Sequence, residues 1–420
     1  KLYPAAADFD HPWLTVNSDG WVKISFINAP LKLKKGEKHL FEFALSPYPF
    51  RPMEENWKKL RFRAGKNSNF DLLWQTSSLF KYCGSTATAA NPEGLRKLLA
   101  GKKGTLLFYQ FPFYIMDNIP EWSYFEKRWK AYPARAYDLR EMGGMAWKGN
   151  LRDRDWQDLY LKIFADHRRE FRWDGVYYDC FGTDVFTENG ELFHPVFDCR
   201  KFQERIYLAQ RMTDPKSLTV THTGAAEFST AVGFSDIILM GEQYRAQCIK
   251  HTYPLEFLTL DEFRYENAVN VGPDRMFLPQ YRDPAKIQSP AVATHILGLV
   301  LTHNLMLYPN LINKEVELSI RNRQFDFGME NSTFHPYWLP KPETADTDNP
   351  ALAVSYWRNP KGFLMVILNP TGKPQTFRLK TVPGKVVFFN PLTGKEENGP
   401  EFKLEPYMSA LVRIFPENQK

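Results

Sequence analysis

The sequence predicts an α/β protein: a (β/α)8 TIM-type barrel over residues 51–345, preceded by a β-strand region over residues 1–50 and followed by a β-sandwich over residues 346–420. Between about residue 54 and residue 308, short apolar runs alternate with stretches of helical periodicity. The patterns on either side contain only strands and turns. Eight strand–helix units in roughly 250 residues are typical of such a barrel. A doubly wound sheet is the alternative.

The first fifty residues are expected to form a small β-element. Residues 13–16 and 21–26 are strand-like and flank the turn sequence NSDG at 17–20, which is a hairpin signal. Residues 38–45 alternate in hydrophobicity as a further strand. Closely spaced prolines then end the pattern.

The predicted barrel strands are short apolar runs separated by helical or loop patterns. Asn91 and Asp153 are in helix N-cap positions, and apolar residues follow Asp153 at helical spacing. Ser289 opens a further apolar helix. The eight strands are predicted at residues 69–75, 105–111, 135–139, 174–179, 217–222, 235–242, 276–281 and 305–308.

After about residue 349 the helical periodicity stops. The turn sequences NPKG, NPTG and NPLTG separate the remaining apolar runs. A sandwich of about 70 residues fits this pattern, with residues 346–350 as its linker. Its strands are predicted at residues 352–357, 363–368, 375–379, 385–389 and 409–414.

The composition is aromatic and mildly basic. Aromatic residues make up 15% of the chain, which favours either stacking on sugar rings or large aromatic cores. The formal net charge of +6 is compatible with an acidic substrate. No dense Lys/Arg run is present, so nucleic-acid binding is not expected.

Membrane association is not expected either. The longest strongly apolar stretch, residues 296–301, is far too short to span a bilayer. The chain opens without the apolar core of a signal peptide, so we expect that any such peptide has been removed. A secreted or periplasmic location is the expectation.

The four cysteines are Cys83, Cys180, Cys199 and Cys248. No C-x-x-C spacing occurs, which argues against a zinc site. Cys180 and Cys199 flank one loop, and a disulfide between them is one interpretation. Unpaired thiols are the other.

Two acidic residues end predicted barrel strands. Residues 174–180 read DGVYYDC and place Asp179 at the end of the fourth strand; residues 236–242 read DIILMGE and place Glu242 at the end of the sixth. Strand C-terminal ends carry the chemistry in such folds, and glycoside hydrolysis needs two carboxyl groups. The structural alternatives are a helix cap or loop ion pair for Asp179 and a pair with Arg245 for Glu242. Asp174, at the start of its strand, is expected to be structural.

Further residues are candidates for contacting substrate. His222 ends the fifth predicted strand and is suited to binding a sugar hydroxyl or orienting a carboxylate, or is simply a buried histidine. Arginines can bind anionic groups, and tryptophan rings at a barrel mouth can stack on sugars. The candidates for substrate binding are Trp74, Trp147, Lys148, His222, Tyr244, Arg245 and Arg282. Tyr178 is expected to face away from Asp179, into packing.

Several other chemistries lack their motifs. The sequence has no dinucleotide-binding or P-loop glycine pattern, no G-x-S-x-G elbow and no H-E-x-x-H helix. No metal or organic cofactor is therefore expected, and the oligomeric state is not predicted.

The two strand-end motifs resemble those of known enzymes. DGVYYDC is similar to the strand-four signature of retaining α-glycosidases in the group around families 31, 36, 101 and 129. This resemblance implies that Asp179 is the nucleophile and that Glu242, within GEQYR, is the acid/base. Residues 222–242 and the LSPYP sequence at 45–49 also resemble uncharacterised family 123-like glycoside hydrolases. The resemblance implies a retaining glycoside hydrolase, and we expect it to be exo-acting on an oligosaccharide. Galacto-configured sugars are candidate substrates, and the basic charge balance and the arginines near the proposed mouth make anionic sugars candidates as well.

Three alternatives remain open. Family 123 hexosaminidases use an adjacent Asp and Glu with the substrate's acetamido group as nucleophile, and Asp261 and Glu262 would match that pair. We expect these two residues on a short helix or loop rather than at a strand end. A non-catalytic sugar-binding barrel and, more remotely, a polysaccharide lyase are the others.

Overall fold

The computed structural model describes residues 14–25, 32–38, 70–73, 92–101, 105–139, 144–181, 186–188, 191–223, 232–268, 272–308, 311–340, 345–381 and 384–416. The chain forms two compact units, residues 1–46 and residues 47–420. In the first unit, β1 (Leu14–Val16) and β2 (Val22–Ile24) pair antiparallel around a turn that ends at Gly20, with a φ of 81°. The predicted hairpin is confirmed. Residues 39–45 of the next predicted strand lie outside the described residues.

A parallel sheet is the centre of the second unit. Every neighbouring pair of its seven described strands is parallel, and their order across the sheet is their order in the chain. The strands are β3 (Phe70–Leu73), β4 (Thr105–Gln110), β8 (Gly175–Tyr178), β11 (Leu218–His222), β12 (Ile237–Met240), β13 (Asp274–Phe277) and β14 (Met306–Leu307). A doubly wound sheet reverses its strand order at a switch point. The described order has no reversal, so the doubly wound alternative is wrong.

One predicted barrel strand belongs to a different sheet. Residues 135–139 contain β6 (Ala136–Leu139), which pairs antiparallel with β7 (Gly144–Lys148), and β7 pairs antiparallel with β5 (Tyr114–Met116). Together with α3 (Trp122–Trp129), this small sheet is inserted between β4 and the next helix. The prediction of a third barrel strand here is therefore wrong, and β8 is the third described strand of the parallel sheet.

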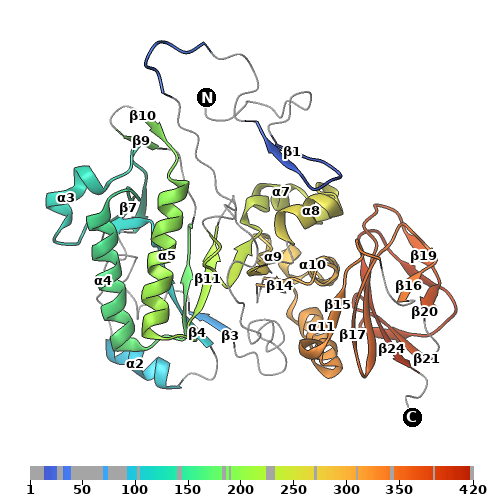
Figure 1. Ribbon diagram of the computed structural model, residues 1–420. Coiled ribbons are helices and arrows are strands. Elements are labelled where there is room, and N and C mark those ends of the chain that lie inside the picture. The colour runs from blue at the N-terminus through green and yellow to red at the C-terminus, as the bar shows by residue number, and fades with distance from the viewer. Residues whose placement is uncertain are drawn as a thin grey trace. The chain divides into compact units, whose positions relative to one another are not determined.

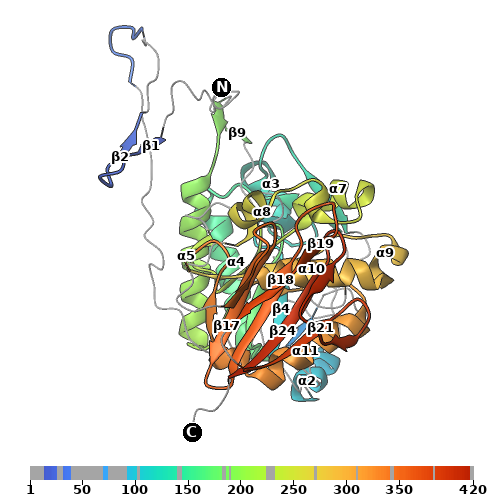
Figure 2. The same ribbon diagram turned by 90° about the vertical axis from the view of Figure 1, so that its right-hand side faces the viewer.

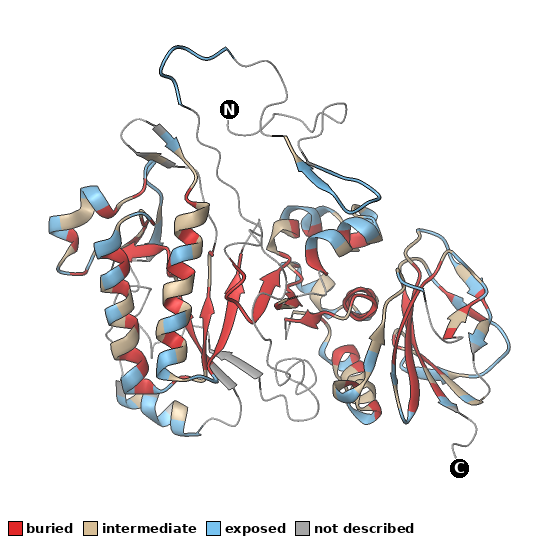
Figure 3. Ribbon diagram, in the orientation of Figure 1, coloured by how far each residue is buried: buried red, intermediate tan, exposed pale blue. Residues whose placement is uncertain are grey.

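Helices α4 (Arg154–Phe171) and α5 (Val196–Thr213) pack side by side on the parallel sheet (Figure 1). As predicted, Asp153 caps α4, because its carboxylate accepts the backbone N–H of Trp156 at 2.9 Å. Strands β8, β11 and β12 are buried along their length, whereas the β1–β2 hairpin is largely exposed (Figure 3). The remaining helix and hairpin on this side are α2 (Pro92–Gly101) and β9 (Phe186–Glu188) with β10 (Glu191–Phe193).

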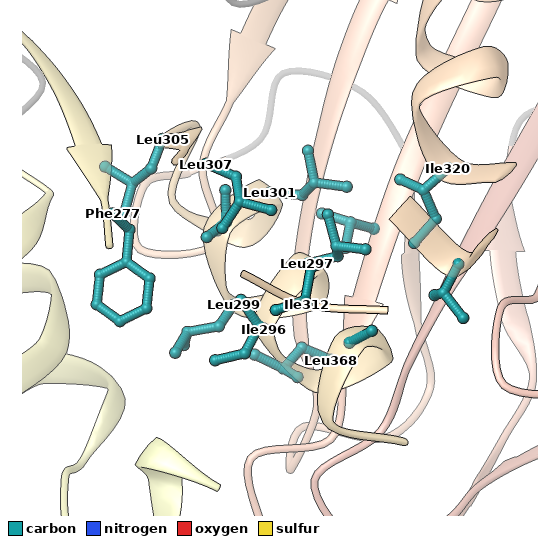
Figure 4. Close-up of a cluster of buried hydrophobic side chains, with 14 of the residues drawn as sticks. Phe277, Ile296, Leu297, Leu299, Leu301, Leu305, Leu307, Ile312, Ile320 and Leu368 are labelled. Atoms are coloured by element: carbon teal, nitrogen blue, oxygen red, sulfur yellow. The ribbon is translucent and has the colours of Figure 1, made fainter. Parts of the chain in front are cut away.

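Helix α10 (Pro290–Thr302) is buried on all sides. Ser289 caps it, as predicted, and its residues 292–302 are all buried. Such an apolar helix must be covered on every face. Figure 4 shows the reason, because Ile296, Leu297 and Leu299 belong to one cluster with Phe277 of the parallel sheet and Leu368 of the C-terminal sheet. The other elements here are α7 (Arg245–Lys250), α8 (Leu260–Asn267), α9 (Pro284–Gln288), α11 (Lys314–Phe327), and the 3-10 turns η2 (Glu242–Tyr244), η3 (Pro254–Glu256) and η4 (Met329–Asn331).

The C-terminal region is a β-sandwich, as predicted. Its larger sheet runs β15 (Thr333–His335), β17 (Ala353–Asn359), β18 (Gly362–Leu368), β24 (Ser409–Pro416), β21 (Gly384–Asn390), β22 (Lys395–Glu397), and its central strands lie side by side in Figure 2. The opposite layer consists of the pairs β16 (Ala345–Thr347) with β20 (Leu379–Thr381) and β19 (Gln375–Phe377) with β23 (Phe402–Leu404). Side chains of both layers share one core. Strand β15 joins this sheet ahead of the predicted boundary at residue 346.

Of the two interpretations of the cysteines, the disulfide between Cys180 and Cys199 is wrong. Cys180, Cys199 and Cys248 are free thiols, and Cys83 lies outside the described residues. Cys199 is buried on α5, whereas Cys180 lies in the turn after β8, where its thiol interacts with Tyr137 of the inserted sheet. The positions of Cys180 and Cys199 on either side of one loop therefore do not bring their sulfur atoms into bonding distance. No described helix is both long and apolar enough to cross a membrane.

Candidate active site

Asp179 lies at the C-terminal edge of the parallel sheet. Its backbone N–H still donates to the Gln110 carbonyl at 2.8 Å, as the last ladder bond between β8 and β4. The chain then turns sharply, because Cys180 has a left-handed φ of 52°. This turn points the Cys180 N–H back to Oδ1 of Asp179, at 2.8 Å. Non-glycine residues in this conformation are often found at functional sites.

Three donors surround the Asp179 carboxylate. Besides the Cys180 N–H, the Tyr109 hydroxyl donates to Oδ2, and Nδ1 of His222 lies 2.7 Å from Oδ1. The Asp179 side chain is 14% exposed. Burial tends to raise the pKa of this carboxyl, but the hydrogen bonds and charge of His222, with those of Tyr109 and Cys180, outweigh it and hold the pKa below its ordinary value. Asp179 is therefore ionised at neutral pH.

His222 reaches Asp179 because of the strand register. Thr221 of β11 is paired with Tyr178 of β8, so the next residues, His222 and Asp179, end neighbouring strands together. The Tyr177 hydroxyl lies 3.0 Å from the same Nδ1. An ionised carboxylate can only accept hydrogen bonds, so Nδ1 carries a proton that points at Asp179.

Glu242 follows the end of β12 and faces the other nitrogen of His222. Its Oε2 is 3.5 Å from Nε2, which is otherwise buried and without a hydrogen bond among the described residues. The Glu242 side chain is 36% exposed, and Arg245 Nη1 lies 3.8 Å from its Oε1. One imidazole thus lies between a buried carboxylate and a half-exposed one.

Gly241 determines how Glu242 leaves the strand. Its φ is 126°, and a β-carbon there would lie 2.3 Å from the Leu278 carbonyl oxygen. Leu278 itself donates its N–H to the Met240 carbonyl at 2.7 Å. Only glycine allows this close approach of two backbones immediately before Glu242.

The tyrosines around Asp179 were not predicted from the sequence. Tyr177 is two residues before Asp179 and therefore lies on the same strand face, a signal that period-two alternation could have supplied. Tyr109 and Tyr137 come from β4 and from the inserted sheet, which no local pattern connects to Asp179. Tyr178, by contrast, points into packing as predicted, with its hydroxyl 3.4 Å from Gln210.

Trp147 does not lie at the edge of the parallel sheet. Trp147 lies in β7 of the inserted sheet rather than at the edge of the parallel sheet, and Lys130 Nζ covers its ring at 3.9 Å from the centroid. This differs from the predicted position, because β6 and β7 belong to that separate sheet. Trp74 lies outside the described residues. Lys148 is buried beside the Tyr114 ring, at 5.1 Å, and its charge acts on Cys180.

Of the other predicted contact residues, Arg245 has its side chain close to Glu242, whereas the side chain of Tyr244 contacts α8 and Arg282 lies ahead of α9. Arg245 is close to Glu242, as described above. Tyr244 is buried, and its hydroxyl donates to Glu266 and accepts from Asn267 Nδ2, which ties it to α8. Arg282 is exposed between β13 and α9.

The rival carboxyl pair is engaged elsewhere. Glu262 forms a capping box with Thr259 at the start of α8, and Asp261 pairs with Arg264 at 3.2 Å. The hydrogen bonds from the Thr259 N–H and hydroxyl lower the pKa of Glu262. Asp174 precedes β8, at the opposite end of the strand from Asp179, and its carbonyl accepts the Leu218 N–H at 3.0 Å. Within the described part of the chain, His, Cys, Asp and Glu form no group of three or more that could hold a metal ion.

The fold is similar to that of a solved α-amylase structure. An α-amylase from Geobacillus thermoleovorans complexed with acarbose aligns with a TM-score of 0.51 and 11% identity, over 87% of this chain and 91% of its own. An α-amylase from H. orenii aligns over 78% of this chain and 84% of its own, with a TM-score of 0.48 and 12% identity. The galactosidase domain of an α-galactosidase-sucrose kinase aligns over 86% of this chain and 52% of that chain, with a TM-score of 0.49 and 11% identity. The first alignment shows a common fold. No protein-family model and no curated protein sequence matches the chain.

Proposed function

We propose that this protein is a glycoside hydrolase, with Asp179 as the nucleophile and Glu242 as the acid/base, and that its parallel sheet closes into a (β/α)8 barrel. One observation carries the proposal: His222 contacts both carboxyl groups, 2.7 Å from Asp179 and 3.5 Å from Glu242, at one edge of the sheet. Two carboxyl groups in different environments at one site are the arrangement that glycoside cleavage requires.

The environments suit the two roles. Asp179 is buried and kept ionised by three hydrogen bonds, so it is available to attack the anomeric carbon. Glu242 is half-exposed and can exchange protons with water after protonating the leaving oxygen. In the second step it would take a proton from the water that hydrolyses the glycosyl-enzyme.

His222 supports both roles through its position. Its Nδ1–H donates to Asp179 at 2.7 Å, and its Nε2 faces Oε2 of Glu242 at 3.5 Å, so one ring orients both carboxyl groups. His222 is thus a positioning residue.

We further propose a retaining, exo-acting mode on an oligosaccharide, with galacto-configured or anionic sugars as candidates, and a secreted or periplasmic location. The retaining and exo-acting modes and the location rest on the expectations from the sequence. Arg245, beside Glu242, supports an anionic substituent on the sugar.

The test is a screen of oligosaccharides with product configuration followed by proton NMR. The proposal expects turnover with retention, and a covalent sugar on Asp179 when a slow activated substrate is used. Binding without turnover on any glycoside would instead support the sugar-binding alternative. Activity confined to N-acetylated sugars, unaffected by Asp179→Asn, would support Asp261 and Glu262, although Glu262 is held in its capping box.

A further inference from the structure

A cavity of about 360 Å³ lies on the C-terminal sheet beside α11, on elements other than those that carry Asp179, His222 and Glu242. Its volume is within the range of sites that bind small molecules. The side chains that matter here come from three elements: Arg323 and Phe327 of α11, Lys385 and Val387 of β21, and Arg413 and Phe415 of β24.

The strand register explains how this cavity forms. Phe389 pairs with Leu411, Val387 with Arg413 and Lys385 with Phe415, so alternate residues of β21 and β24 share one face of the sheet. At Phe389 and Leu411, this face is part of the core that α10 and α11 cover. Helix α11 ends at Phe327, and beyond it the same face becomes charged and open.

Arg413 is a cation without an anionic partner among the described residues. Its Nη2 donates to the Lys361 carbonyl at 2.9 Å, and its guanidinium stacks on Phe327 and Phe415 at 4.2 and 4.6 Å. Its Nε is buried and has no hydrogen bond within the described part of the chain. Removing an unpaired charge from water is unfavourable, and an anion bound in the cavity would offset that cost.

The other charges leave the cavity cationic. Arg323 is compensated, because it pairs with Glu396 at 3.2 Å and lies 3.4 Å over the Phe389 ring. Lys385 is exposed and has no ion pair with the described residues. With Asp326 and Glu396 as the acids, three cations face two anions, a net charge of +1. Phe415, 41% exposed, adds an apolar surface at the rim.

We propose that this cavity is an accessory binding site for an anionic saccharide, whose carboxylate or sulfate is held by Arg413 and Lys385 while a sugar ring lies against Phe415. The choice of a saccharide rests on the proposed function. A planar guanidinium held by stacking is suited to an oxyanion, and an exposed ring beside it is suited to the apolar face of a sugar.

The experiment is isothermal titration of the full chain, in an Asp179→Asn background so that no probe is consumed. The probes are trigalacturonic acid, a sulfated trisaccharide, neutral maltotriose and inorganic sulfate. We expect one or both anionic trisaccharides to bind more tightly than maltotriose and sulfate. The trisaccharide that binds more tightly shows whether the cavity prefers a carboxylate or a sulfate. Lys385→Ala, Phe415→Ala and Arg413→Gln should each weaken this binding, and loss of the charged donor should do so by roughly tenfold to a hundredfold.

The matched control is Lys403→Ala, an exposed lysine of the opposite layer that pairs with Glu405, and it should leave binding unchanged. Lys385 and Phe415 are exposed, so their variants keep the test valid even when Arg413→Gln does not fold. Equal binding of maltotriose, equal binding of sulfate alone, or unchanged binding in Lys385→Ala and Phe415→Ala would overturn the proposal. Turnover of a small aryl glycoside, measured without the Asp179 change, should be unaffected by Lys385→Ala and Phe415→Ala. If the parent protein does not turn over any glycoside, the proposed function is contradicted, but the binding of anionic saccharides in this cavity is not.

Discussion

Nδ1 of His222 lies 2.7 Å from Oδ1 of Asp179, at the ends of two neighbouring parallel strands. The same ring faces Glu242 with its second nitrogen, Nε2, which is 3.5 Å from Oε2. The ring therefore orients Asp179 and Glu242 relative to each other at one edge of the sheet.

Removing this ring should change both the rate and its pH dependence. His222→Ala is expected to lower kcat/KM on the order of 10²-fold, the size typical for losing one preorganised donor. Without the His222 hydrogen bond and charge, the pKa of Asp179 rises toward its ordinary value, so the acidic limb of the pH profile moves to higher pH. Tyr177→Phe, which keeps the imidazole, is the control and should leave the acidic limb in place. An unmoved acidic limb in His222→Ala would show that Asp179 does not depend on this ring.

Glu242→Gln should separate poor leaving groups from good ones. Cleavage of unactivated glycosides is expected to fall by about 10²–10⁴-fold, because the leaving oxygen is no longer protonated. Glycosides with acidic phenol leaving groups need little protonation and should form the glycosyl-enzyme at a nearly normal rate, measured as a burst of phenol. Glu256→Gln, at another partly exposed glutamate, should change neither. Equal loss on both substrate types would refute the acid/base role.

Gly241→Ala should be far more disruptive than a change at another left-handed glycine. The new β-carbon would lie 2.3 Å from the Leu278 carbonyl oxygen, and the φ of 126° is unfavourable for alanine. Strain and overpacking together should cost about 2–5 kcal/mol in the free energy of unfolding. Gly394, with a φ of 70° and no atom within 4 Å of the place that a β-carbon would occupy, is the matched control, and Gly394→Ala should cost only about 1 kcal/mol. Urea denaturation of both variants measures the difference, and equal costs would contradict the steric argument.

Buried histidines should make the protein less stable in mild acid. Burial lowers the pKa of His295 and of His303 to about 4, from an ordinary 6.5. Between these values the unfolded chain binds a proton that the folded chain does not, so the free energy of unfolding falls as the pH decreases from 6.5 to about 4. The slope is about 1.4 kcal/mol per pH unit for each histidine.

His295→Asn isolates one of these contributions. The asparagine amide can still donate to the Tyr407 carbonyl, which Nδ1 of His295 approaches at 2.7 Å, but it does not titrate. Urea denaturation at several pH values should show a shallower dependence in this variant, whatever its absolute stability. An unchanged slope would show that His295 does not contribute.

The candidate site was predictable where it depended on the ends of strands. Apolar runs ending at Asp179, His222 and Glu242 indicated that these residues lie on one edge of a parallel sheet, and the described strands have that arrangement. The catalytic roles of these residues remain predictions. The prediction of a third barrel strand at residues 135–139 was wrong. Strand β6 has the length and composition of a barrel strand, but it pairs antiparallel with β7. Pairing direction is a property of partners distant in the chain.

Local sequence patterns were sufficient to predict the alternation of strands and helices, the hairpin at Gly20 and the sandwich strands after residue 352, because periodicity and turn residues act over short distances in the chain. The groups around Asp179 depend instead on long-range packing. Tyr109 and His222 are 70 and 43 residues away from it in the chain, and strand register brings them to its carboxylate. Long-range packing also keeps the Cys180 and Cys199 thiols unpaired. It forms the cavity at Arg413 as well, because α11 ends there and leaves one face of the C-terminal sheet uncovered.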